Sequence, residues 1–338
     1  MSKIKSIILK ISFLLLITLL LIVLAGLTVF EQKINQPLKL DQNTLLTVGS
    51  GTSIGQLSQQ LLAQHWLKNR FWLRNYPRFY TQFADIKAGT YQIKIGTTAK
   101  QLLAQLVAGK EHQFEITFIE GTTFKQWLLL LQQQPYLNHN LKNKKISQIT
   151  QLLAIKHANP EGLFFPDTYA YTAGTDELTL LRRAHQRMEK ILQQQWQTRA
   201  TGLPYSNAYQ ALIMASIIEK ETSKLAEQPL IASVFTNRLF KKMRLQTDPT
   251  IIYGLGDRYQ GDIKRAHKYE KTAYNTYRIN GLPPTPIAMP GESALSAVMH
   301  PAATSYLYFV SKGNGYHQFS DNLKDHNRAV NLFQRKKK

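Results

Sequence analysis

The chain opens with one long apolar run and continues with short alternating segments. Residues 11–30 contain no charged side chain and are mostly Leu, Ile and Val. At about 1.5 Å per residue, a helix of this length covers the roughly 30 Å apolar core of a bilayer. No later stretch approaches this length without a charge. The pattern therefore predicts a single transmembrane helix.

The charges that flank this run indicate its orientation. Lys3, Lys5 and Lys10 precede it, and Glu31 is the first acid after it. By the positive-inside rule, residues 1–10 are cytoplasmic and the rest of the chain lies outside. A cleaved signal peptide would have an apolar core of about 7–15 residues and end in small residues of the A-x-A type. The run is longer and lacks A-x-A, which favours an uncleaved anchor in the inner (cytoplasmic) membrane.

One local pattern recurs three times in the first half of the chain. Each copy is an apolar segment, then Gly-Thr and a Ser or Thr, with Gln three residues later. A Ser or Thr N-cap with Gln at N3 forms a capping box, so each copy predicts a strand, a turn and a helix start. The predicted caps are Ser53, Thr98 and Thr123, paired with Gln56, Gln101 and Gln126. We predict a small strand–helix module over residues 41–112 and a bridging segment over 113–200.

The most informative predicted helix covers residues 209–222. Ser206 or Asn207 can cap its first turn. Residues 211–218 are apolar or small, interrupted only by Ser216. A helix that is apolar on all sides is buried, so we expect this helix in the core of its domain.

Glu219 follows this buried stretch directly and is a candidate general acid. Its neighbours at i−3 and i−4, Ser216 and Ala215, are small, so that face could hold a ligand against the carboxylate. Partial burial should raise the pKa of Glu219 and leave it protonated near neutral pH. Glu221 lies about 200° further round the helix, and we predict that Lys220 and Glu221 face solvent. The alternative is that Glu219 only ends a buried helix.

Three polar loops follow this helix and could bind sugars. Residues 244–250 carry many donors and acceptors, residues 273–277 place tyrosines beside an amide, and the loop that begins at 281 contains four prolines. Flat aromatic faces with amide and carboxylate groups suit sugar rings, although core tyrosines are the alternative. The candidate substrate-binding residues are Gln246, Thr247, Asp248, Tyr274, Asn275 and Tyr277.

The composition excludes several classes of site. The 338 residues include no Cys, which excludes a disulfide framework, thiol catalysis and a Cys-ligated metal. None of the nine histidines occurs in an H-x-H, H-x-x-x-H or H-E-x-x-H pair, so we predict no metal. His300, His317 and His326 are more simply structural. A P-loop, a G-x-S-x-G elbow and a Rossmann fingerprint are missing, and we predict no cofactor.

The net charge of +21 fits the predicted location. Beyond the anchor, 39 basic side chains face 21 acidic ones. A chain exported across a membrane meets no nucleic acid, so its anionic neighbours are lipid headgroups and cell-wall polymers.

Several motifs resemble the endolytic murein transglycosylase (YceG-like) family. They are ASIIEKET at 215–222, SVFTNRL at 233–239, MRLQTDPTIIYG at 243–254, AYNTY at 273–277, GLPP at 281–284 and His300-Pro301. Their order and spacing match the family along roughly 200–330. The segments 88–91 and 120–123 and the single N-terminal anchor are also similar to it. One departure is Thr285, where the family pattern has Gly or a similarly small residue.

This resemblance implies an α+β chain with a LysM-like N-terminal module that contacts glycan and a mixed α/β catalytic domain at 201–338. It also implies endolytic cleavage of the MurNAc–GlcNAc bond in nascent peptidoglycan strands, which ends their growth. The family's catalytic acid is taken as the first Glu of the ASIIEKE motif, which is Glu219 here. A single carboxyl group suffices, because the MurNAc C6 hydroxyl replaces water and forms a 1,6-anhydro ring. Cell-wall synthases are candidate partners.

Two alternatives stay open. A muramidase would use water and a second carboxyl group, for which Asp248 is the candidate. A non-enzymatic wall-binding scaffold of the elongation or division machinery would explain the anchor, the module and the charge. It would not explain an acid at the end of a buried helix.

Overall fold

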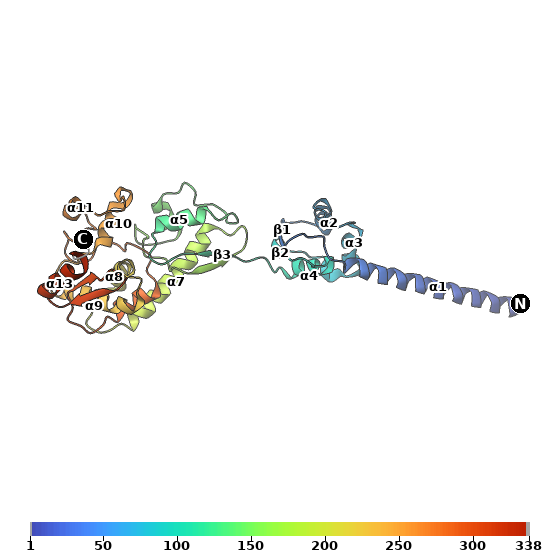
Figure 1. Ribbon diagram of the computed structural model, residues 1–338. Coiled ribbons are helices and arrows are strands. Elements are labelled where there is room, and N and C mark those ends of the chain that lie inside the picture. The colour runs from blue at the N-terminus through green and yellow to red at the C-terminus, as the bar shows by residue number, and fades with distance from the viewer. Residues whose placement is uncertain (1, 336–338) are drawn as a thin grey trace. The chain divides into compact units, whose positions relative to one another are not determined.

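The computed structural model describes residues 2–335 and shows a mixed α and β fold, as predicted. Met1, in the predicted cytoplasmic N-terminus, and residues 336–338, at the end of the predicted catalytic domain, lie outside the described residues. The chain forms two compact units, Met1–Phe114 and Glu115–Lys338. Figure 1 shows the elements of each unit. The predicted bridging segment 113–200 falls almost wholly within the second unit.

Helix α1 (Ser2–Ile34) contains the predicted transmembrane run. The most apolar 18-residue window of the segment Ile4–Ile34 has a mean hydropathy of 3.0, and among the described residues this is the one helix long and apolar enough to cross a membrane. Large apolar side chains such as Val29 are exposed along it, whereas Phe30 and Ile34 are buried. The last turn of α1 therefore belongs to the core of the first unit.

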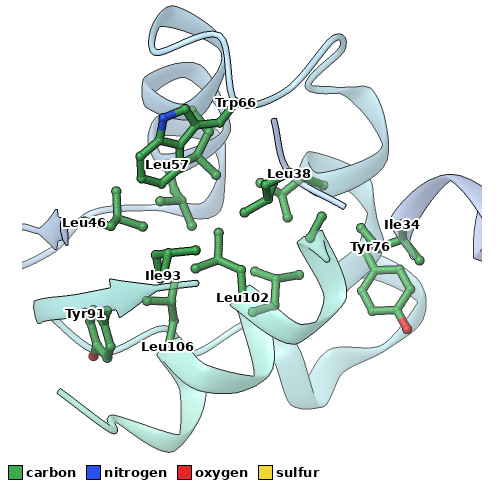
Figure 2. Close-up of a cluster of buried hydrophobic side chains, with 14 of the residues drawn as sticks. Ile34, Leu38, Leu46, Leu57, Trp66, Tyr76, Tyr91, Ile93, Leu102 and Leu106 are labelled. Atoms are coloured by element: carbon green, nitrogen blue, oxygen red, sulfur yellow. The ribbon is translucent and has the colours of Figure 1, made fainter. Parts of the chain in front are cut away.

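The rest of the first unit is a two-stranded antiparallel sheet covered by helices. Strand β1 (Thr44–Val48) pairs with β2 (Gly89–Ile93) so that Thr44 faces Ile93 and Val48 faces Gly89. The helices are α2 (Ile54–Ala63), α3 (Phe71–Phe79), the 3-10 turn η1 (Thr81–Phe83) and α4 (Ala99–Ala108). Figure 2 shows how Leu57, Leu102 and Leu106 pack against strand residues such as Ile93. A LysM-like character of this module stays a prediction.

The three predicted capping boxes are all confirmed. Ser53, Thr98 and Thr123 directly precede α2, α4 and α5 (Phe124–Gln132), and their side chains accept from the backbone N–H groups of Gln56, Gln101 and Gln126. Each Gln Oε1 in turn accepts from the N-cap N–H at 2.8–2.9 Å. The boxes satisfy N–H groups that have no partner within the helix.

The second unit is mainly helical, with two small sheets. Strand β3 (Phe114–Thr117) pairs with β4 (Thr168–Tyr171), and β5 (Tyr308–Ser311) pairs with β6 (His317–Ser320) in antiparallel register. The helices up to residue 240 are α5, α6 (Ile146–Leu152), α7 (Glu177–Gln197), α8 (Ala208–Glu221), the turn η2 (Leu225–Glu227) and α9 (Gln228–Phe240). The helices after residue 240 are α10 (Asp248–Leu255), η3 (Gly256–Arg258), α11 (Arg265–Tyr269), α12 (Glu292–Met299), α13 (Leu323–Val330) and η4 (Asn331–Arg335).

Helix α8 lies in the core of the second unit, as its sequence predicts. Asn207 caps it by accepting from the Gln210 N–H, and every residue from Ala211 to Ile218 is buried. Helices α7, α9, α10 and α12 pack around it. The prediction of a loop over 244–250 is partly wrong, because α10 already begins at Asp248. Pro249 suits this first helical turn, where a backbone N–H would have no partner within the helix.

A buried carboxyl group joins the predicted bridging segment to α10. Glu161 accepts from the Phe124 N–H at 2.9 Å and from the Tyr253 hydroxyl at 3.2 Å. Burial raises the pKa of Glu161 to about 7. The neighbouring Phe164 is buried and stacks on Phe124, so the aromatic turn at 161–169 packs the interior.

Replacing Thr123 by Ala should destabilise the second unit by about 1 kcal/mol, because the N-terminal N–H groups of α5 lose their cap. Thr123→Ser keeps the hydroxyl and should cost less than half as much. Denaturant unfolding of the full chain in detergent, followed by circular dichroism, measures both. Equal losses for Ala and Ser would show that the hydroxyl is not the stabilising group.

Candidate active site

The end of α8 presents two glutamates to different surroundings. Glu219 and Glu221 are two positions apart, about 200° round the helix. Both are partly buried, whereas Lys220 between them is exposed. The two carboxyl groups therefore contact different segments of the chain.

Glu219 contacts the loop that leads into α12. Its Oε2 accepts from the N–H of Gly291, the N-cap residue of α12, at 3.0 Å. Beside it, the Ser216 hydroxyl accepts from the Ile287 N–H at 3.0 Å. The face predicted to hold a ligand is therefore covered next to Ser216 by the chain itself, which corrects that expectation. The pKa of Glu219 is raised, as predicted, chiefly by burial and less by nearby Glu120.

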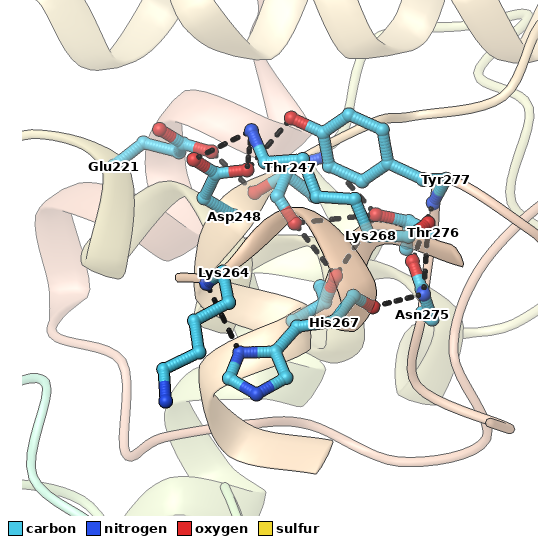
Figure 3. Close-up of polar contacts among 10 residues, drawn as sticks. Glu221, Thr247, Asp248, Lys264, His267, Lys268, Asn275, Thr276 and Tyr277 are labelled. Atoms are coloured by element: carbon cyan, nitrogen blue, oxygen red, sulfur yellow. Dashed lines mark hydrogen bonds and ion pairs between the residues drawn. The ribbon is translucent and has the colours of Figure 1, made fainter. Parts of the chain in front are cut away.

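Glu221 does not face solvent, so that prediction is wrong. Its carboxylate accepts a hydrogen bond from the Thr247 hydroxyl (Figure 3). Glu221 also lines a cavity of about 630 Å³. Burial raises the pKa of Glu221 to about 7, and the charge of Asp248 adds to the rise. The Thr247 bond and the charge of Arg238 act in the opposite direction. The sequence could not show this burial, because α9 and the strand β5 supply part of the cavity wall.

Three predicted substrate-binding residues share this cavity with Glu221. Gln246, Asp248 and Tyr277 line it, and Thr247 reaches it through its bond to Glu221. The Tyr277 hydroxyl donates to Asp248 Oδ1 at 2.7 Å, and Lys268 Nζ lies 3.3 Å from the same oxygen (Figure 3). The structure thus brings these residues together in one cavity wall, and their contact with sugar stays a prediction.

The two other predicted binding residues, Tyr274 and Asn275, form hydrogen bonds within the protein. Asn275 is 1% exposed, and its amide donates to the carbonyl groups of His267 and Glu270 at 3.0 and 2.7 Å. Its Oδ1 accepts from the Tyr277 N–H at 3.0 Å, so it holds the backbone of Tyr277. The Tyr274 hydroxyl bonds the Thr285 hydroxyl at 2.8 Å. Direct contact of either residue with a sugar stays a prediction.

Sequence reasoning missed a cation and two rings in the cavity wall. Arg238 is 8% exposed; its Nε donates to Leu307 O at 2.7 Å and its Nη1 to Leu245 O at 2.9 Å. It lies 5.1 Å from the ring of Tyr308, on which His326 stacks at 5.0 Å. A single Arg within the mostly buried helix α9 was the available signal, since a buried charge needs partners.

The histidines of the second unit differ in their surroundings. His317 is paired through Nδ1 with Glu227 Oε2 at 2.8 Å, which makes it a structural residue. His326 also lines the cavity, and its Nδ1 is buried without a hydrogen-bond partner in the part of the chain that the structure describes. Burial lowers the pKa of His326. Within residues 2–335, no group of three His, Asp or Glu side chains could hold a metal ion.

These features define the class of site. A polar cavity contains a carboxyl group whose pKa of about 7 lets it both give and take a proton near neutral pH. Such a pairing of cavity and shifted pKa is typical of enzymes that use general acid–base catalysis.

The chain belongs to the YceG-like family, whose model matches residues 46–332. This confirms the family that the sequence motifs predicted. An endolytic murein transglycosylase of Bacillus subtilis (strain 168) is 30% identical over 331 residues, which cover 91% of this chain and 90% of the relative. One of Streptococcus pneumoniae serotype 2 (strain D39) is 26% identical over 339 residues, which cover 87% of this chain but 59% of that longer protein.

A solved structure has a similar fold. The crystal structure of a YceG-like protein from Listeria monocytogenes superimposes with a TM-score of 0.52 at 26% identity. The match covers 85% of this chain and 99% of that chain. It supports the mixed α and β architecture described above.

Replacing Glu221 by Gln should change how stability depends on pH. Because the folded-state pKa is about 7 and the ordinary value is 4.5, the folded protein binds more protons between those values, and stability falls as pH rises through this window. The stability of Glu221→Gln relative to the native protein should therefore rise from about pH 4.5 to about pH 7 and then level off. Denaturant unfolding across this range measures the difference. A difference independent of pH would contradict the raised pKa.

Proposed function

We propose that the protein is a membrane-anchored lytic transglycosylase that cleaves the MurNAc–GlcNAc bond within peptidoglycan strands. The names of the related proteins support the substrate and the endolytic action. The observation that carries the chemistry is the Glu221 carboxyl group, with its pKa near 7, in the cavity that Gln246, Asp248 and Tyr277 line. Anhydro-MurNAc ends are the expected product.

Glu221 is the better candidate for the acid than Glu219, the sequence-based choice. Glu221 lines a cavity large enough for sugar rings and shares it with three of the six predicted binding residues. Glu219 instead accepts a hydrogen bond from the start of α12, beside a face that the 284–291 segment covers. We assign Glu219 to holding α8 against α12, and its role as the acid becomes the competing hypothesis.

The proposed reaction needs one carboxyl group that acts twice. Protonated Glu221 gives its proton to the glycosidic oxygen as the bond from that oxygen to C1 of MurNAc breaks. The resulting carboxylate then removes the proton from the C6 hydroxyl of the same MurNAc, and this oxygen attacks C1. The intramolecular nucleophile gives a 1,6-anhydro ring and returns Glu221 to its protonated form without using water.

Neighbouring charges suit both halves of this cycle. Asp248 and burial favour the protonated acid, whereas Thr247 and Arg238 favour the carboxylate. These opposing effects leave the pKa of Glu221 near 7. Near neutral pH, neither the protonated nor the ionised form is then strongly disfavoured. Negative charge on Asp248, held by Tyr277 and Lys268, can also stabilise positive charge that develops at C1.

The anchor determines where this activity would take place. We place residues 1–10 in the cytoplasm, α1 in the inner membrane and both folded units on its outer side, in line with the charges that flank the helix. The LysM-like module would contact glycan, and cleavage close to the membrane would end the growth of nascent strands. Cell-wall synthases are the partners expected in this position.

A hydrolytic muramidase is the second candidate, because Asp248 lines the same cavity as Glu221. A hydrolase uses one carboxyl group as the acid and a second as base or nucleophile. Asp248 is already bound by Tyr277 and Lys268, which restricts its movement. A non-enzymatic scaffold would leave the shifted pKa of Glu221 without a role.

Digestion of purified peptidoglycan by the full chain in detergent should release fragments with anhydro-MurNAc ends, which mass spectrometry identifies. Glu221→Gln should lower the rate by about 10²–10⁴-fold, because it removes the proton donor. Glu219→Gln is the matched control: its amide oxygen can still accept from the Gly291 N–H, and we expect a loss below about tenfold.

Three results would contradict parts of this proposal. A large loss only in Glu219→Gln would restore Glu219 as the acid. Ordinary reducing ends in place of anhydro ends would identify a hydrolase and implicate Asp248. Binding of glycan without any product would favour the scaffold.

The pH dependence of the rate should follow the titration of the acid. We expect kcat/KM to fall about tenfold per pH unit above about pH 7, since the free enzyme must hold Glu221 protonated. Initial rates of product release from about pH 5 to about pH 9 measure this. A profile that is flat through pH 7 would exclude a group with this pKa as the essential acid.

A further inference from the structure

Helix α3 presents an unusual outward face. At 100° per residue, Phe71, Arg74, Arg78 and Phe79 fall within one sector of about 140°. Phe71 is 53% exposed and Phe79 is 66% exposed, and both arginines are exposed. The opposite face, which includes Leu73, Tyr76 and Pro77, is buried in the core of the first unit. Large rings and cations thus share the face that is not packed.

This face adjoins the outer end of the apolar run in α1. Phe30, the last residue of that run, lies 5.5 Å from the ring of Phe79 and 5.5 Å from that of Trp72. Its ring also stacks on Tyr76 at 5.8 Å. Phe71 in turn contacts Trp72 at 5.0 Å. The aromatic rings of α3 are therefore fixed at the level where the apolar segment of α1 ends.

The charge of this face is not cancelled by neighbouring acids. Glu31, the nearest acid in the sequence of α1, forms an ion pair with Lys100 at 3.1 Å. Among residues 2–335, no ion pair joins Arg74 or Arg78 to an acid. Two cations beside two exposed aromatic rings need a partner that is anionic and apolar at once.

We propose that this face of α3 lies in the headgroup layer of the outer leaflet of the membrane that α1 spans, with its arginines on anionic lipid phosphates. Aromatic rings concentrate at the membrane–water interface, and Arg side chains there reach headgroups. Amphipathic helices with a cationic and aromatic face bind in this layer. Because α3 is packed on the end of α1, the first unit is held against the bilayer. The inference rests on the proposed anchoring by α1.

A fluorescence-quenching experiment tests this contact in the full chain. The protein has no Cys, so a single introduced Cys can carry a fluorophore at one chosen position. Arg78→Cys places the label at the centre of the α3 face and keeps both phenylalanines. Ser50→Cys, in the exposed turn after β1, is the control in the same unit, and Leu20→Cys marks the span. Each is reconstituted in vesicles of phosphatidylethanolamine and phosphatidylglycerol that contain lipid with a nitroxide near the headgroup or deep in the acyl chain.

The label at position 78 should be quenched at least about twofold more than the label at 50, and more by the shallow nitroxide than by the deep one. The label at 20 should show the reverse preference for depth. Equal, weak quenching at 78 and 50 with strong quenching at 20 would overturn the proposal and leave the anchor intact. Weak quenching at 20 would remove the anchor and the proposal together.

A charge variant tests the role of the cations separately. In the protein labelled at 78, Arg74→Glu should reduce shallow quenching at least about twofold, because it repels anionic headgroups. Lys94→Glu makes the same change of charge at an exposed site after β2 and should leave the quenching unchanged. Equal reductions by both variants would show a general charge effect and contradict a site on α3.

Discussion

The burial of α8 is the constraint on which the site depends. Eight consecutive buried residues fix this helix among α7, α9, α10 and α12, so its last turn has little freedom to move. Glu219 and Glu221 are consequently held on different sides, one against the start of α12 and the other against Thr247. The same burial removes water from the Glu221 carboxyl group and raises its pKa to about 7. One rigid helix end thus holds two carboxyl groups in different surroundings.

The cavity around Glu221 is assembled from segments that lie far apart in the sequence. Arg238 comes from α9, Asp248 from the start of α10, Tyr277 from the loop held by Asn275, and His326 from α13. Each of these residues is positioned by hydrogen bonds or ring contacts within the protein before any substrate binds. Such prior organisation is what electrostatic catalysis requires, because the charges need not rearrange during the reaction. At the other end of the chain, the last turn of α1 is built into the first unit in a similarly rigid way.

Local features such as helix caps were predictable from the sequence, but the different surroundings of Glu219 and Glu221 were not. The caps Ser53, Thr98 and Thr123 act on residues three positions away, so short-range pattern alone located them. The burial of α8 followed from its composition. The environments of Glu219 and Glu221, in contrast, depend on Ile287, Gly291 and Thr247, which reach α8 only through the tertiary fold. Helical spacing correctly separated the two glutamates but could not tell which one meets a cavity.

The most direct test of this account is a crystal structure of Glu221→Gln with a bound peptidoglycan oligosaccharide that contains an intact MurNAc–GlcNAc bond. The account predicts that the glycan occupies the cavity lined by Gln246, Asp248 and Tyr277, with the glycosidic oxygen about 3 Å from the side chain at position 221. A glycan bound with that oxygen against Glu219, away from position 221, would contradict it.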